Sequence, residues 1–587
     1  MCVIKLFKFF DKKDWFRIFI CVLFVIGGVC LELKMPDYMS EVTRLVQTSG
    51  SKMNDILING GYMLLCAFGG LFFAIGTGYY SATISSDFSM KIRKAIFDKV
   101  EISGMQDIKS FSASSLITRT TNDVTQVEML IGMGLHLLLR APIMAGWAIT
   151  KILNKNFEWS VITGGAVVIL LTIIFMLMRI VIPRFKLIQK LTDNLNGITS
   201  ENLKGIRVVR AFNAEDFEEK KFKKINDELT NTLNYNQKRF AVMMPSMYLV
   251  MHSVTLLIYF TGAFMISSSL LADRLLIFSN MVVFSSYAMQ VIMSFLMLAM
   301  IFMILPRAEV SAKRINEVLD SEVSIISGNF DGNTDLIGTV EFKNVSFKYP
   351  DADEYVIRDI SFIANKGETV AFIGSTGSGK STLINLIPRF YDATEGEVLV
   401  DGVNVKNYDL TALMNKLGYV PQKAVLFNGS VKYNVSYGKS LKKISLNKVK
   451  EAIKVAQADD FVSKMKNMFE GNIAQSGSNI SGGQKQRLAI ARAIARDPEI
   501  YIFDDSFSAL DYKTDKALRK ALKNYTKDAT SLIVAQRIGT IMNADKIIVL
   551  DNGICVGVGT HQELLKSCDV YKQIALSQLS KEELQNG

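Results

Sequence analysis

The sequence predicts an α-helical domain with six membrane spans followed by an α/β domain. Its 587 residues are too many for one compact core, so at least two domains are expected. Hydrophobic residues make up 49% of the chain, too many for a soluble or disordered protein, yet 21% are charged, too many for a protein lying wholly in lipid. Near Val340 the pattern changes from long apolar runs to short β-rich runs that alternate with helices.

Composition also excludes several classes of protein. The formal net charge of +11 is not concentrated in one part of the chain, so nucleic acid is not an expected partner. The six cysteines include no CxxC pair, and they predict neither a disulfide framework nor a metal site. A fibrous or secreted protein is therefore not expected.

Six apolar runs are long enough to cross a bilayer, which takes about 20 helical residues. They lie near Trp15–Leu33, Ile56–Ser81, Met129–Leu153, Trp159–Val181, Ala241–Ser267 and Leu275–Leu305. Basic residues precede the first run as in a signal peptide, but no small-residue cleavage site follows it, so we interpret it as a membrane helix.

The charge of the loops predicts the orientation. The expected outer loops at 34–55, 154–158 and 268–274 each balance to zero, whereas the stretch 184–240 holds twelve Lys/Arg and the N-terminus holds five. Basic loops stay on the cytoplasmic side of a membrane. We therefore expect a multi-pass protein of the plasma (cell inner) membrane, with both termini and the α/β domain in the cytoplasm.

The expected inner segments, 82–128 and 182–240, are rich in charge but also have apolar residues at helical spacing. They are expected to extend the membrane helices into the cytoplasm, and two flexible loops are the alternative. A helix over Ala308–Leu319 is expected after Pro306.

The same pattern gives the domain boundaries. Residues 1–320 are expected to form the transmembrane domain, with long cytoplasmic helical extensions. The Gly-, Asn- and Asp-rich stretch 321–339 is expected to be a linker, and residues 340–580 the second domain.

A glycine-rich motif marks the second domain. It reads Gly374-Ser375-Thr376-Gly377-Ser378-Gly379-Lys380-Ser381-Thr382 and stands between the expected strand Thr369–Ile373 and the expected helix Thr382–Ile387. A turn of this kind lets backbone N–H groups surround a phosphate, and the helix adds its partial positive charge. Lys380 is expected to reach the β- and γ-phosphates of ATP, and Ser381 to bind Mg²⁺. The fold class is therefore an α-helical six-span transmembrane domain followed by an α/β P-loop nucleotide-binding domain.

Two further motifs follow in the same domain. The strand pattern Ile500–Phe503 ends in Asp504, whose carboxylate can hold Mg²⁺ from the opposite side. Between the two sites, Ile480 precedes Ser481-Gly482-Gly483-Gln484, which opens a helical run. With these motifs in this order, nearly the whole chain resembles an ATP-binding cassette (ABC) exporter of the half-transporter kind, an ATP hydrolase coupled to membrane transport. The usual leading Leu of the signature is Ile480 here.

The resemblance implies further roles, position by position. Tyr349 matches the aromatic residue that stacks on adenine, and Gln422 matches the glutamine that touches Mg²⁺. Ser508–Asp511 matches the loop that faces a second cassette, while Thr118–Asp123 and Gly205–Phe212 resemble the segments that carry coupling helices. In such proteins each ATP lies between the phosphate loop of one chain and the signature of the other. A dimer is therefore implied, and the signature residues would act on the partner's ATP; they are Ser481, Gly482, Gly483 and Gln484.

Two positions depart from the family pattern, and both concern hydrolysis. The usual Glu after the strand-ending Asp is Asp505 here, which is one methylene shorter, and the usual His of the switch loop is Gln536, which cannot become cationic. Positioned proton transfer is worth roughly 10²- to 10⁴-fold in rate. The chain thus resembles the degenerate-site subunit of bacterial heterodimeric multidrug-type exporters. Its own site would be slow, and its signature would complete the active site of a second half-transporter carrying Glu and His.

Other interpretations stay open at this point. The first is an active homodimer that tolerates both changes. Another is an ATP-gated regulatory membrane protein that moves no cargo. An importer is disfavoured, because importers of this family normally carry their membrane and nucleotide domains on separate chains.

The membrane spans say less about the cargo. Membrane lipids and an amphipathic or hydrophobic small molecule are the expected partners. Four methionines fall on one helical stripe of the sixth span, which suits either varied apolar ligands or ordinary helix packing; they are Met289, Met293, Met297 and Met300. Arg140 and His252 lie within spans and should face a cavity or a partner rather than lipid.

Overall fold

The computed structural model describes residues 2–48, 50–153, 156–350, 352–439 and 443–578. It divides the chain into two compact units, one of Met1–Glu101 with Ala113–Ser321 and one of Ile102–Ser112 with Glu322–Gly587. Part of the expected outer loop, residues 154–155, and the expected domain end at 580 lie outside the described residues.

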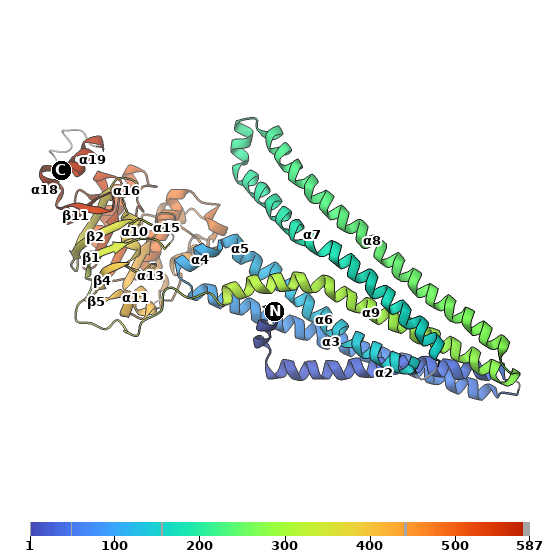
Figure 1. The fold of residues 1–587 in the computed structure, drawn as a ribbon. Coiled ribbons are helices and arrows are strands. Elements are labelled where there is room, and N and C mark those ends of the chain that lie inside the picture. Colours follow the sequence, from blue (N-terminus) through green and yellow to red (C-terminus); the bar gives the residue numbers. More distant parts are fainter. Residues whose placement is uncertain (1, 49, 154–155, 351, 440–442, 579–587) are drawn as a thin grey trace. The chain divides into compact units, whose positions relative to one another are not determined.

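The first unit is built from helices (Figure 1). They are α1 (Cys2–Leu6), α2 (Lys12–Gln47), α3 (Met53–Ile102), α5 (Ala113–Thr118), a π-helical turn (Arg119–Asp123), α6 (Val124–Leu153), α7 (Phe157–Ala211), α8 (Glu215–Ser268) and α9 (Leu271–Leu319). Within the described residues, six segments are long and apolar enough to cross a membrane, which confirms the expected spans. They are Lys12–Gln47, Met53–Ile102, Ala113–Leu153, Phe157–Arg184, Glu215–Ser268 and Asp273–Leu319.

The inner segments are largely helical, as expected. Helix α3 runs on to Ile102, and α7 and α8 lie side by side along their length, joined by a short turn after Ala211 (Figure 1). The alternative of two flexible loops is therefore wrong. Helix α9 also passes through Pro306 without a break, so the expected separate helix over Ala308–Leu319 is its last part.

The first outer loop is shorter than the sequence predicts, because α2 continues to Gln47. Polar contacts with neighbouring helices hold this extension. Lys151 lies 2.7 Å from Asp37, and the hydroxyl of Tyr287 donates to the Leu33 carbonyl and to Asp37 at 2.9 and 2.7 Å. Lys151 and Tyr287 lie more than 100 positions along the chain from this end of α2. The helical propensity of the residues near position 40 therefore does not predict these contacts.

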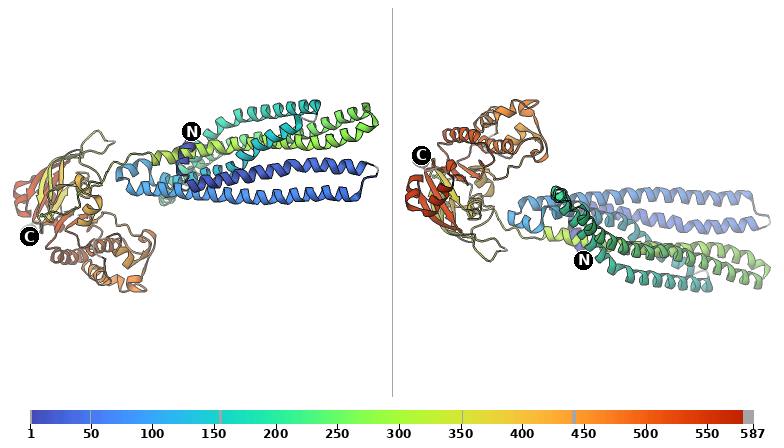
Figure 2. Two further views of the ribbon diagram at one scale, coloured as in Figure 1. Left: turned by 90° about the horizontal axis from the view of Figure 1, so that it is seen from below. Right: turned by 90° about the horizontal axis from the view of Figure 1, so that it is seen from above.

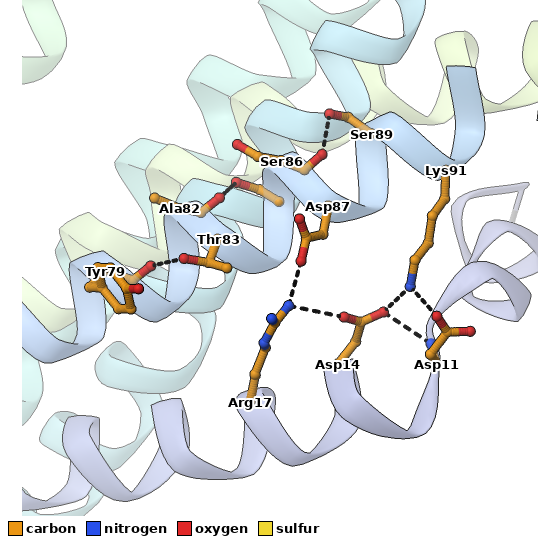
Figure 3. Close-up of polar contacts among 11 residues, drawn as sticks. Asp11, Asp14, Arg17, Tyr79, Ala82, Thr83, Ser86, Asp87, Ser89 and Lys91 are labelled. Carbon is orange, nitrogen blue, oxygen red and sulfur yellow. Dashed lines mark hydrogen bonds and ion pairs between the residues drawn. The ribbon is translucent and has the colours of Figure 1, made fainter. Parts of the chain in front are cut away.

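Charged side chains fasten the start of α2 to α3 (Figure 3). The ammonium of Lys91 lies 2.6 Å from Asp11 and 2.5 Å from Asp14, while Arg17 pairs with Asp87. Asp14 is buried, and a buried carboxylate is stable only when it is paired. The network therefore fixes where the first membrane helix begins against the second.

Arg140 forms an ion pair with Glu32 beside a cavity of about 310 Å³ between α2, α3 and α6. The cavity is lined mainly by apolar side chains, together with His136 of α6. Arg140 thus faces a cavity, as expected, and its charge is balanced by Glu32. His252 instead has an exposed side chain that stacks on Tyr248, with ring centroids 6.4 Å apart.

In its described residues, the second unit has three sheets, with helices packed around them (Figure 2). The strands are β1 (Val340–Phe347), β2 (Ile357–Ala364), β3 (Thr369–Gly374), β4 (Glu395–Val400), β5 (Val403–Asn404), β6 (Leu417–Val420), β7 (Gly429–Ser430), β8 (Asn472–Ile473), β9 (Ile500–Asp504), β10 (Thr530–Val534), β11 (Lys546–Asp551) and β12 (Ile554–Gly559). The helices are α4 (Met105–Phe111), α10 (Lys380–Asn385), α11 (Leu410–Lys416), α12 (Val431–Val435), α13 (Leu446–Val455), α14 (Asp459–Val462), α15 (Gly482–Ala495), α16 (Tyr512–Tyr525), α17 (Ile538–Ile541), α18 (His561–Ser567) and α19 (Asp569–Gln578).

The main sheet has the order β12-β11-β3-β10-β9-β6, with β12 antiparallel to β11 and the other strands parallel. Its inner strand β3 is buried on both faces: Val370 and Phe372 belong to one hydrophobic core, while Ala371 and Ile373 belong to another. A parallel sheet covered on both faces is typical of α/β proteins. A second sheet, in the order β2-β1-β4-β5, is antiparallel. Together these features confirm the predicted fold class.

Candidate nucleotide-binding site

The candidate residues meet at one edge of the main sheet. Strands β3, β10, β9 and β6 are adjacent and parallel, so their carboxyl ends lie together. The phosphate loop follows β3, and Gln536 comes shortly after β10. Asp504 is the last residue of β9 and Asp505 comes directly after it, while Gln422 comes shortly after β6. Ligands of open α/β sheets bind at this kind of edge.

The glycines of the loop are required by its geometry. Gly379 has φ +90°, a conformation that favours glycine, and a Cβ there would lie 2.6 Å from the side chain of Ile357. A Cβ on Gly374 would lie 2.0 Å from the Leu550 carbonyl oxygen. The loop then enters α10 directly at Lys380. Both ends of the loop thus pack too closely for a side chain.

Lys380 is folded back onto this loop. Its ammonium donates to the carbonyls of Gly374 and Ser375 at 2.9 and 2.7 Å, and the residue is only 8% exposed. Burial lowers the pKa of Lys380, although Asp505 and Asp504 oppose that change. It also donates to the Ser378 hydroxyl at 3.3 Å. A cation whose hydrogen-bond partners are all neutral is suited to bind an anion that enters the loop.

Ser381 and Asp504 form the centre of the candidate metal site. The Ser381 hydroxyl donates to Asp504 Oδ1 at 2.7 Å, and Asp504 is 5% exposed. Burial raises the pKa of the Asp504 carboxyl, with Asp505 adding to the shift. With the amide oxygen of Gln422, whose amide nitrogen contacts the next residue, Asp505, the hydroxyl and the carboxylate would make an all-oxygen donor set, which is what Mg²⁺ prefers.

Asp505 is bound by both neighbouring amides. Gln536 donates to its Oδ2 atom at 2.7 Å and Gln422 donates to the same oxygen at 3.2 Å. Both glutamines are exposed, whereas Asp505 is 7% exposed. Burial raises the pKa of the Asp505 carboxyl, and the hydrogen bonds partly offset this. The structure therefore brings together the two positions that depart from the family pattern, through one carboxylate oxygen.

Tyr349 follows β1, next to the start of α10. Its hydroxyl lies 3.2 Å from the Thr382 hydroxyl, and its ring is perpendicular to those of Phe347 and Tyr391. The ring is partly exposed, so one side remains available for stacking. Lys109 of α4, which no sequence motif singled out, also lies against this ring.

The signature opens a different helix, α15. Ser481 is its N-cap: its hydroxyl accepts from Gln484 N at 3.3 Å, and Ser481 N donates to the Gln484 side chain at 2.9 Å. Ser481 and Gly482 are exposed, and a Cβ on Gly482 would meet nothing within 4 Å. A Cβ on Gly483 would lie 3.2 Å from the Ala509 carbonyl, in the loop Ser508–Asp511. The outer face of this helix start is therefore open to a ligand.

Comparison with known proteins gives two family matches. Residues 18–295 match the ABC transporter transmembrane region, and residues 357–508 match the ABC transporter family. Their order along the chain is the order expected from the sequence.

Individual relatives cover most of the chain. It is 38% identical over 523 residues to an uncharacterized ABC transporter ATP-binding protein of Mycobacterium tuberculosis, which spans 88% of this chain and 87% of that protein. It is 31% identical over 512 residues to the ATP-dependent lipid A-core flippase of Pseudomonas aeruginosa, over 87% and 83% of the two chains. The structure of a bacterial Atm1-family ABC exporter with ATP bound has the same fold, with a TM-score of 0.83 over 96% and 99% of the chains at 22% identity.

Proposed function

We propose that this chain, which belongs to the ABC transporter family as an exporter whose fused domains couple ATP to transport, is the slow-hydrolysing subunit of a heterodimer. Its own phosphate loop binds ATP at a site that turns over poorly. Its signature completes the fast site of a second half-transporter, which carries Glu and His at the positions of Asp505 and Gln536.

The proposal rests mainly on the hydrogen bonds that the Asp505 carboxylate accepts. A general base needs a free lone pair directed at the attacking water. Oδ2 of Asp505 instead accepts hydrogen bonds from Gln536 and Gln422, and the aspartate side chain is one methylene shorter than the usual glutamate. Gln536 has no ionisable group to exchange a proton. These features favour retention of ATP over its hydrolysis.

The residues that bind ATP are kept, and each has a role in the proposal. Tyr349 stacks on adenine and Lys380 balances the phosphate charge. Ser381, Asp504 and Gln422 would hold Mg²⁺, which would supply positive charge to offset that of the phosphates. The middle of the phosphate loop, between Gly374 and Gly379, is formed by Ser375, Thr376, Gly377 and Ser378.

The cargo proposed is an amphipathic or hydrophobic small molecule. The cavity beside α2, α3 and α6 joins apolar walls to the Glu32–Arg140 pair, and ligand sites combine those two features. On α9 the four methionines of the stripe are only partly buried, with Met293 38% exposed. That exposure supports a pliable apolar surface over simple core packing.

The proposed topology follows the loop charges. Residues 1–320 form the transmembrane domain, 321–339 the linker and 340–580 the cytoplasmic nucleotide-binding domain, in the cell inner membrane. Both termini are cytoplasmic in this arrangement.

Cysteine labelling in intact cells tests that orientation. In a chain whose native cysteines are replaced, Thr48→Cys is expected to react with a membrane-impermeant maleimide, and Asp227→Cys is expected to react only after the cells are opened. Both positions are exposed, so access depends on the side of the membrane alone. The reverse pattern of labelling contradicts the orientation.

Restoring the family residues tests the slow site itself. In a heterodimer whose partner carries Gln in place of its own catalytic Glu, the double variant Asp505→Glu with Gln536→His is expected to raise ATP turnover about 10-fold, at the low end of what a positioned base contributes. Asp505→Glu alone should give less, because Gln536 would still donate to the carboxylate. Fast turnover by the unmodified chain alone, with no gain in the double variant, favours the homodimer instead.

A further inference from the structure

Helix α4 places a lysine in a corner between two aromatic rings of the nucleotide-binding domain. The ammonium of Lys109 lies 5.2 Å from the ring centroid of Tyr349 and 5.4 Å from that of Tyr391. The two rings are perpendicular, with an interplanar angle of 88° and centroids 5.3 Å apart. Each ring can therefore attract the cation with its electron-rich face.

The position of Lys109 is fixed from the other end of α4. Asp107 accepts hydrogen bonds from Gly104 N at 2.9 Å and from Ser324 N at 3.0 Å. A Cβ on Gly104 would lie 2.8 Å from the Ser324 hydroxyl, so the two segments are in close contact. Hydrogen bonding to Tyr391 raises the pKa of Lys109, although burial opposes it, so the amine stays charged at neutral pH.

We propose that Lys109 competes with the adenine base of ATP for the ring of Tyr349, and thereby lowers the affinity of this chain's own site. The inference rests on the adenine-stacking role proposed for Tyr349. When the base stacks on Tyr349 it displaces the ammonium, and the hold of the domain on α4 weakens.

Competition follows from which side of Tyr349 is open. Its hydroxyl is held near Thr382, and its neighbours Phe347 and Tyr391 are 3% and 6% exposed and belong to the hydrophobic core. A base must therefore approach from the exposed side. Lys109 is itself exposed and comes from a helix outside that core, so it approaches from there too.

Loss of the Lys109 charge is expected to change ATP affinity in the direction opposite to that expected from electrostatics alone. Removing a positive charge near a polyanion weakens its binding when only charge matters. Removing a side chain that competes with adenine for the ring of Tyr349 instead strengthens ATP binding. The direction of the change in ATP affinity therefore separates the two.

The experiment measures displacement of a fluorescent trinitrophenyl-ATP by ATP, using the full-length chain in nanodiscs. Lys109→Met is expected to tighten ATP binding about 3- to 10-fold, the range of one cation–π contact. Lys109→Arg keeps a cation over the rings and should leave the affinity unchanged. Tyr391→Phe keeps the ring but loses its hydroxyl, and should give a smaller gain in the same direction.

Two controls isolate the base and the charge. Inorganic tripolyphosphate has no base to stack, so Lys109→Met should not tighten its binding. Lys348→Met removes a neighbouring cation that lies 5.7 Å from the ring of Tyr355 instead, and should not tighten ATP binding.

Unchanged or weaker ATP binding in Lys109→Met overturns the proposal, as does an equal gain for tripolyphosphate. Failure of the proposed ATP site looks different: Tyr349→Ala would then leave ATP binding unaltered, whatever residue stands at 109.

Discussion

Gly482→Asp is expected to lower ATP turnover of the assembled transporter by at least about 100-fold. The variant chain is still expected to fold. Position 482 is the first residue of α15, where a Cβ meets nothing within 4 Å and an acidic residue suits the helix start. The added carboxylate would repel the γ-phosphate of the partner's ATP and block the helix amides. Loss of one such donor costs about 10²- to 10³-fold in rate.

The matched variant is Asp505→Asn in the same chain. It should change turnover of the heterodimer only about twofold, since Asp505 serves the slow site and proton transfer there contributes little. The measurement is steady-state ATPase of the purified complex, with thermal melting to show that both variants fold. Collapse in Asp505→Asn, with tolerance at Gly482, contradicts the assignment of slow and fast sites. Gly483 is a poorer choice, because a Cβ there would lie 3.2 Å from the Ala509 carbonyl.

The second large effect is expected at Lys380. Lys380→Ala should weaken ATP binding at this chain's site about 100-fold, because loss of charge-assisted contacts to phosphate costs about 3 kcal/mol. Photo-crosslinking of azido-ATP to this chain, over a range of ATP concentrations, measures the change. The partner's crosslinking serves as the internal standard.

Two further variants define the cause. Tyr349→Ala should also weaken crosslinking, whereas Tyr349→Trp keeps a stacking surface and should restore it. Lys380 holds the loop carbonyls of Gly374 and Ser375 in the structure, so Lys380→Arg tests whether a cation alone is sufficient. Undiminished crosslinking in both alanine variants contradicts the assigned site.

The sequence alone was sufficient for features that are local in the chain. A membrane span depends on the length and apolarity of one continuous run, so all six could be placed. The phosphate loop and its flanking strand and helix are likewise contiguous, and β9 is found at the expected Ile500–Asp504. The helical course of α3, α7 and α8 follows from the spacing of apolar residues along single segments.

Features that depend on residues far apart in sequence were decided only by the tertiary structure. Asp505 shares one oxygen with Gln536 and Gln422, which are 31 and 83 positions away and follow different strands of the parallel sheet. The pairing of Arg140 with Glu32 and the extension of α2 to Gln47 depend on contacts between separate membrane helices. The place of Lys109 between Tyr349 and Tyr391 was likewise invisible, because a seven-residue helix carries no motif of its own. Hydropathy and spacing describe how each segment meets solvent or lipid, whereas these contacts exist only once strand order and helix packing have brought distant side chains together.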